Sequence, residues 1–189
     1  MNSLASPVED EKTLAALALA MVDHPRATLQ ELAKAIGVSK ATLYRFCKTR
    51  EQLIERLFDH SASRLRRSID EAELERGPAV PALRRLIQGQ LVHKELTAFL
   101  TYYWKPDSMQ DPRGVETWTA FDAAVDAFFL RGQQEGAFRI DISAAALTET
   151  LFSMVIGLLD AERRGRVARA AVPDMVEQVF LRGVAAAAR

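Results

Sequence analysis

Cysteine is almost absent from this sequence of 189 residues, since Cys47 is the only one. An intramolecular disulfide is therefore impossible, which favours a reducing compartment. The three histidines are far apart in the sequence, and no His-Glu-x-x-His pair occurs. The usual zinc-binding patterns are thus missing, so we expect neither a metal nor another cofactor. Cys47 itself has two interpretations, a packed core residue or a redox-sensitive thiol.

The sequence also lacks the marks of secretion and of membrane insertion. Residues 1–12 are polar and include three consecutive acidic residues, unlike a basic and then apolar leader. Charged residues interrupt every apolar stretch well short of the ~20 residues that span a bilayer. We therefore expect a cytoplasmic protein without a membrane partner.

Net charge is absent overall, because 25 basic residues balance 25 acidic ones. The balance is uneven along the chain. Residues 26–50 contain six basic residues and one acidic residue, Glu31, which gives this segment a charge of +5 and the remainder −5. A basic segment on an acidic body predicts a polyanionic partner at one end of the protein.

No segment alternates polar and apolar residues with the period of a β-strand, and almost all apolar patterns have helical spacing. We therefore predict an all-α fold, with helix ends marked by Thr28, Ser39, Thr49 and Ser143 as caps and by Gly37 as a stop. The predicted helices cover residues 9–22, 28–36, 40–46, 49–75, 80–90, 92–104, 113–135, 143–164 and 173–187.

The segment from Thr28 to Arg50 has the spacing of a helix-turn-helix. Ala33 is small where the two helices cross, Gly37 begins a three-residue turn, and Leu43 faces back into the module. With Leu43 inside, Lys40 and Arg45 can reach bases or phosphates. The other outward residues of this helix, Ala41, Thr42 and Tyr44, suit close contact with a thymine methyl group and hydrogen bonds to phosphates.

This segment, with Gly-Val-Ser-Lys-Ala-Thr-Leu-Tyr followed by Lys-Thr-Arg-Glu-Gln-Leu, resembles the DNA-binding signature of TetR/AcrR-type bacterial regulators. The resemblance covers residues 10–58, and the link before Thr28 is shorter than usual and lacks glycine. It implies a homodimer that binds a pseudo-palindromic double-stranded operator and responds to a small-molecule effector. Carried over by position, the DNA contacts are Thr28, Gln30, Ser39, Lys40, Ala41, Thr42, Tyr44, Arg45, Lys48 and Arg50.

The predicted domains are a homeodomain-like three-helix module over residues 1–50 and a helical effector-binding and dimerisation bundle over residues 51–189. The two C-terminal helices are apolar around most of their circumference, which favours a dimer interface over a purely internal core. The predicted interface residues are Leu147, Leu151, Met154, Val155, Leu158, Val176, Val179 and Phe180.

Aromatic residues concentrate in the bundle, where they form either an effector pocket or ordinary core. The predicted pocket residues are His93, Phe99, Tyr103, Trp104, Trp118, Phe121, Asp122 and Phe128. The function that we predict is a transcriptional regulator, most simply a repressor released by a small, largely apolar effector, and not an enzyme. Two alternatives are a regulator of this fold controlled by a protein partner and a helical enzyme or carrier with an incidental helix-turn-helix.

Overall fold

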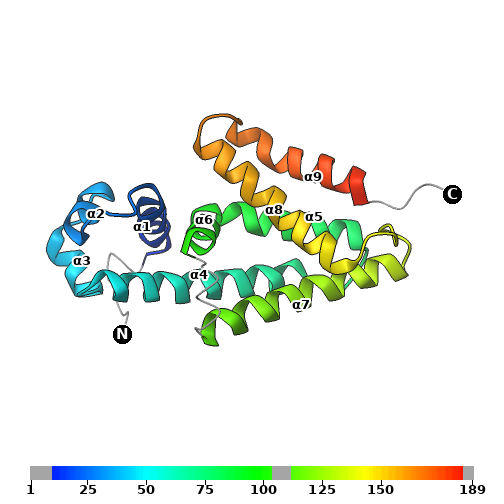
Figure 1. The fold of residues 1–189 in the computed structure, drawn as a ribbon, viewed down its shortest axis with the longest axis horizontal. Helices are drawn as coiled ribbons and strands as arrows, with labels where there is room; N and C mark the ends of the chain where they lie inside the picture. Colours follow the sequence, from blue (N-terminus) through cyan, green and yellow to red (C-terminus); the bar gives the residue numbers. More distant parts are fainter. Residues whose placement is uncertain (1–9, 104–111, 185–189) are drawn as a thin grey trace, which may run out of the picture. The chain divides into compact units, whose positions relative to one another are not determined.

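The computed structural model describes residues 10–103 and 112–184, and over these residues the chain is helical, without a β-strand (Figure 1). The all-α prediction is therefore confirmed. The helices are α1 Glu11–Asp23, α2 Leu29–Ala35, α3 Lys40–Phe46, α4 Arg50–Ala72, α5 Ala79–Val92, α6 Lys94–Tyr103, α7 Pro112–Gln134, α8 Ala144–Arg163 and α9 Val172–Val184.

The helix ends lie where the sequence placed its caps and stops. Thr28 and Glu31 form a complete capping box at the start of α2. The side chains of Ser39 and Ser143 accept hydrogen bonds from the backbone amides of the third residue that follows each of them. Gly37 has a φ of +73°, the left-handed conformation that glycine adopts without steric cost. One short element was not predicted, a 3₁₀ turn over Arg169–Ala171 directly before α9.

Packing divides the chain into two compact units. The first comprises residues 10–63 together with 95–103, and the second comprises residues 64–94 together with the described residues from 112 onward. Sequence reasoning placed the division at residue 50, the first residue of α4. The observed division falls inside α4, because the first half of that helix packs with α1, α2 and α3.

The first unit has a continuous apolar core to which α6 contributes. Leu17, Leu32, Leu43 and Leu57 are fully buried in this core and come from four different helices. Phe99 of α6 is also fully buried in it. Helix α6 is therefore part of the packing of the N-terminal module, although residues 64–94 separate the two in sequence.

The core of the second unit is built on phenylalanine side chains. Phe128 and Phe129 of α7 lie 5.6 and 5.4 Å, centroid to centroid, from Phe138 in the following turn. The ring of Phe180 in α9 lies 5.9 Å from that of Phe129. Gly132 lies against the same ring of Phe138, and a Cβ atom at this position would overlap two of its carbons. The close approach of Phe138 to α7 thus requires a glycine.

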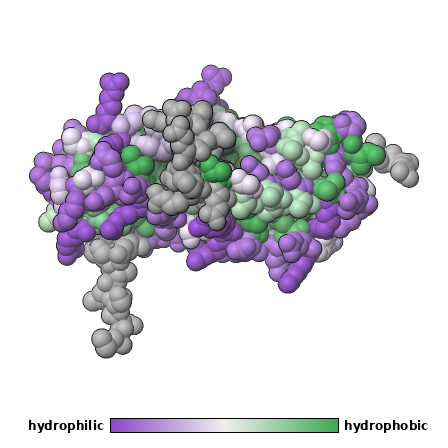
Figure 2. Space-filling view, turned by 60° about the horizontal axis from the view of Figure 1, so that its bottom comes forward, coloured by the Kyte–Doolittle hydropathy of each residue, from purple (hydrophilic) through white to green (hydrophobic). Residues whose placement is uncertain are grey.

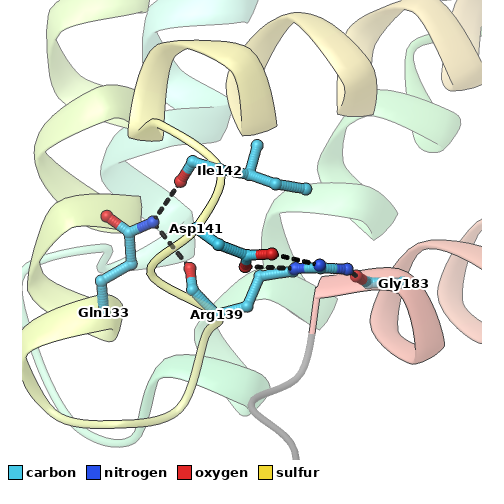
Figure 3. A network of polar contacts seen from close by, with 5 residues as sticks. All are labelled: Gln133, Arg139, Asp141, Ile142 and Gly183. Atoms are coloured by element: carbon cyan, nitrogen blue, oxygen red, sulfur yellow. Dashed lines mark hydrogen bonds and ion pairs between the residues drawn. The ribbon is translucent and has the colours of Figure 1, made fainter.

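A polar network joins the connection between α7 and α8 to the end of α9 (Figure 3). The Gln133 side chain donates hydrogen bonds to the carbonyl groups of Arg139 and Ile142, at 2.8 and 2.7 Å. The Arg139 guanidinium forms an ion pair with Asp141, which lowers the pKa of that carboxyl to about 2, and also donates to the carbonyl of Gly183 at 3.1 Å. This network fixes the C-terminal end of α9, where helix carbonyls would otherwise lack partners.

Hydrophilic side chains cover most of the face in Figure 2, and apolar side chains gather there in smaller patches. Among the described residues, the large apolar side chains that are exposed are Val92, Tyr102, Leu130, Ile140, Met175 and Val179. Helix α8 is long and apolar enough to cross a membrane, by length and composition only. Within the described residues, 28% of its most apolar stretch is buried. Helix α8 therefore has more apolar surface than this chain covers.

Candidate nucleic-acid interface

The helix-turn-helix is formed by α2, the turn Gly37-Val38-Ser39, and α3. Ala33 and Leu43 are buried, at 1% and 0% exposure, where the two helices pack against each other. The apolar side of α3 is completed by Phe46, and the guanidinium of Arg56 lies over its ring, 4.9 Å from the centroid. With this side of α3 fixed inside, the opposite side is left on the surface.

Most of the predicted DNA contacts lie on that surface. Thr28, Gln30, Ser39, Lys40, Ala41, Arg45 and Lys48 are exposed, and Thr42 and Tyr44 are half-buried. The Ser39 and Thr42 hydroxyl oxygens lie 2.7 Å apart, so one donates to the other. Glu31, the only acid within residues 26–50, is held by Thr28, and these hydrogen bonds lower the pKa of its carboxyl. The exposed face of the module is therefore basic, with its one carboxylate engaged in a helix cap.

Three of the predicted contacts meet on this face across α2 and α3. The Lys40 ammonium donates to the side-chain carbonyl of Gln30 at 3.2 Å. The same ammonium lies 5.4 Å from the centroid of the Tyr44 ring, within the range of a cation–π contact. These two contacts orient the Lys40 side chain on the exposed face of the module.

Arg50 is placed differently from the other predicted contacts. It is half-buried, and its guanidinium donates hydrogen bonds to the carbonyls of Pro25 and Ala27 and to the Tyr103 hydroxyl, at 2.7, 2.9 and 2.9 Å. The structure therefore directs this side chain inward, to acceptors of its own chain, where the resemblance implied a DNA contact. The basic character of the segment could not reveal this, because an inward arginine and an outward one look alike in sequence.

Cys47 is a core residue. It is 2% exposed, its thiol lies 3.7 Å from the Leu43 carbonyl, and burial raises the pKa of the thiol. A buried thiol with a raised pKa forms little of the reactive thiolate. Of the two interpretations, the structure supports packing.

Comparison with known proteins agrees with this geometry. The model of the family described as bacterial regulatory proteins, tetR family, matches residues 15–57. The HTH-type transcriptional regulator NfxB of Pseudomonas aeruginosa is 50% identical over 181 residues, which cover 95% of this chain and 96% of NfxB. This chain belongs to the TetR family. It is accordingly a DNA-binding transcriptional regulator and not an enzyme.

Solved structures of the family have the same fold. LfrR of Mycobacterium smegmatis, solved in complex with proflavine, superposes with a TM-score of 0.68 at 24% identity, over 90% of this chain and 92% of LfrR. MbdR of Azoarcus sp. CIB gives a TM-score of 0.70 at 21% identity, over 91% of this chain and 97% of MbdR. The regulatory fold thus extends through both units of this TetR-family chain.

The predicted pocket residues are divided between the two units. Phe99 and Tyr103 belong to the first unit, where their rings lie 4.6 Å apart. In the second unit, Phe121 is buried between Trp118 and Phe152, with ring centroids at 6.0 and 4.6 Å. At Phe99 and Phe121, the helical spacing of the aromatic residues therefore corresponds to packing in a core. Trp104 lies outside the described residues.

The polar members of the predicted pocket have separate surroundings. His93 follows α5, and its Nε2 atom lies 2.9 Å from the Arg64 guanidinium. Asp122 is on α7, where burial raises the pKa of its carboxyl, with further contributions from Glu149 and Asp126. The assignment of these two side chains to one pocket stays a prediction.

A cavity of about 490 Å³ lies in the second unit, between the end of α4 with its following turn and α7. Leu74, Ala124, Ala127 and Phe128 contribute apolar surface, while Asp70, Glu73, Glu75, Arg76 and Arg131 contribute charge. Phe128 is the one predicted pocket residue that lines it. The other lining residues were not predicted from the sequence, because charged residues at this spacing are typical of a solvent-exposed helix end.

The predicted dimer residues separate into two groups. Five of them are buried in the core of the second unit, with exposures of 1% or less, namely Leu147, Leu151, Val155, Val176 and Phe180. Helix α8 packs on α7 and on α9 within the same chain, which accounts for the burial of these five, and their place in an interface stays a prediction. The other three remain accessible: Met154 and Leu158 are half-buried, and Val179 is 58% exposed.

Proposed function

We propose that this chain is a homodimeric repressor that binds a pseudo-palindromic operator through α3 and is released by a small, largely apolar effector. The observation that carries the proposal is the exposed basic face of α3, on which Lys40 is held by Gln30 and Tyr44. A helix of this kind reads base edges from the major groove, and two copies in a symmetric dimer read two half-sites. The direct contacts are the predicted residues other than Arg50.

Dimerisation through α8 and α9 accounts for their uncovered apolar surface. The two helices lie side by side (Figure 1), and they pack against each other. Met154 and Leu158 of α8 and Met175 and Val179 of α9 are partly or largely exposed. Two such pairs related by a twofold axis would bury these side chains in a four-helix interface.

An effector site in the second unit is supported by the cavity beside Phe128. Its volume of about 490 Å³ is in the range that small-molecule sites occupy. LfrR, a relative with the same fold, has been solved with proflavine, which supports a small-molecule effector over a protein partner. As a regulator that binds DNA, the protein would act in the cytoplasm.

The test is footprinting and quantitative binding on the DNA upstream of the gene that encodes this chain. Lys40→Ala and Tyr44→Ala should each weaken binding by ~1–3 kcal/mol if the residue reads a base. Arg166→Ala, which removes an exposed charge in the second unit, is the matched control and should bind as the wild type does. Absence of specific protection at any salt concentration would refute the proposal, and unchanged affinity in both α3 variants would refute the assigned face.

A further inference from the structure

Arg50 is a point at which three separate segments of the first unit meet. Its own position is the first residue of α4. Its guanidinium donates to the carbonyls of Pro25 and Ala27, in the link between α1 and α2, and to the Tyr103 hydroxyl at the end of α6. Since a guanidinium is planar and carries five donors in a rigid fork, these three hydrogen bonds fix the relative positions of their acceptors.

The Tyr103 side chain is itself held in place. Its ring lies 4.6 Å from that of Phe99, which is fully buried in the core of the module. Its hydroxyl donates to the carbonyl of Met21 in α1 at 3.5 Å while accepting from Arg50. The hydroxyl therefore connects α6 to α1 and, through Arg50, to the α1–α2 link.

The link that Arg50 holds leads directly into the DNA-binding face. It runs over residues 24–27 without a glycine, and the capping residue Thr28 follows at once. Gln30, two residues further on, is the partner that orients Lys40. A shift of the Pro25 and Ala27 carbonyls would therefore move the first turn of α2, and with it the support of Lys40.

We infer that Arg50 and Tyr103 form a positioning pair, which sets the α1–α2 link and thereby the DNA-binding face, and that Arg50 does not bind phosphate. The inference rests on the DNA-binding function of the chain. It assigns to α6 an influence on the helix-turn-helix that passes from the Tyr103 hydroxyl through Arg50 to the α1–α2 link. Arginine and tyrosine act here through the residues that they orient, since neither belongs to the exposed face.

The experiment compares Arg50→Gln, Tyr103→Phe and the double variant with the wild type. Tyr102→Phe is the matched control, because Tyr102 is the neighbouring residue of α6 and its side chain is 47% exposed. Lys48→Gln, at an exposed position of the basic segment, is the reference for a phosphate contact. Tyr103→Phe retains the packed ring and removes only the hydroxyl, so it preserves the fold if Arg50→Gln does not.

The first measurement is hydrogen–deuterium exchange of the backbone amides in residues 24–32, without DNA. Loss of a hydrogen bond to a charged group should speed this exchange roughly tenfold in Arg50→Gln and in Tyr103→Phe. The double variant should exchange little faster than Arg50→Gln alone, because the Tyr103 hydroxyl acts on the link through Arg50. Tyr102→Phe should match the wild type. Wild-type exchange rates in both single variants would overturn the inference, whether or not an operator is found.

The second measurement is the salt dependence of binding to the upstream DNA fragment. Lys48→Gln should lower the magnitude of the logarithmic salt slope by about 0.9, as loss of one phosphate contact does. Arg50→Gln and Tyr103→Phe should bind roughly tenfold more weakly with the wild-type slope. A slope lowered by about 0.9 in Arg50→Gln, with wild-type binding by Tyr103→Phe, would overturn the inference. Failure of every variant and of the wild type to bind the fragment would refute the proposed function, and the exchange experiment would still decide on the pair.

Discussion

Replacing Val179 by glutamate should separate the proposed dimer without unfolding the chain. Complete burial of a valine side chain contributes ~1.5–3 kcal/mol, and Val179 still has 58% of its surface to bury. Each protomer would thus lose ~1–1.7 kcal/mol, and the symmetric dimer ~2–3.4 kcal/mol, from apolar contact alone. At about 1.4 kcal/mol for each factor of ten, the dimer dissociation constant should rise roughly 30- to 270-fold. Burial of two carboxylates would add to this change.

Sedimentation equilibrium over a range of protein concentrations measures this constant, and far-ultraviolet circular dichroism reports on the fold. Val92→Glu is the matched control, since Val92 is 67% exposed at the end of α5, outside the proposed interface. Leu151→Glu should instead unfold the chain, because Leu151 is buried within it at 1% exposure. A folded Val179→Glu protein with the wild-type dissociation constant would refute the α8–α9 interface.

Three further predictions concern the chain itself. Gly132→Ala should lower the thermal midpoint by ~4–8 °C, because overlap with Phe138 costs ~3 kcal/mol and the gain in helix propensity returns only ~1 kcal/mol. Adding Phe138→Leu to this variant should recover part of the loss. An unchanged midpoint in Gly132→Ala would contradict the close packing. Asp141→Asn should reduce the urea midpoint near neutral pH, and the difference should vanish as the pH falls below about 2, since a pKa lowered from 3.8 contributes stability only while the carboxylate is ionised. Cys47 should react slowly with iodoacetamide in the native protein and rapidly in denaturant, and rapid native reaction would contradict its burial.

The sequence could predict the features that depend on neighbouring residues. Ser39 and Ser143 cap their helices as expected, since a hydroxyl three residues before an amide needs only local backbone geometry. Gly37 ends α2 with a positive φ for the same reason. The exposed face of α3 follows from the burial of Leu43, a matter of helical period alone. These local rules were enough to predict the fold class and most of the DNA-binding face.

Features that depend on distant residues were harder to predict. The direction of Arg50 is set by Tyr103, which is 53 residues away, and no pattern near Arg50 records this partner. Helices that are apolar all round, such as α8, do not reveal which apolar side belongs to the core, so Leu151 and Val179 appeared equivalent. The phenylalanine cluster similarly has the composition of a ligand pocket, and only packing identifies Phe121 as core.

The presence of α6 in the first unit limits how this regulator can be recombined. A chimera that joined only residues 10–50 to another sensor would leave behind Leu57 and Phe99, both fully buried in the core of the module. The DNA-binding unit of such a chimera would have a gap in its apolar core where these two side chains belong. It would also lose the Tyr103 hydroxyl, which accepts a hydrogen bond from Arg50. The smallest DNA-binding unit that can be transferred is therefore discontinuous in sequence. Exchanges of this unit between homologous regulators should include α6 together with the helix-turn-helix.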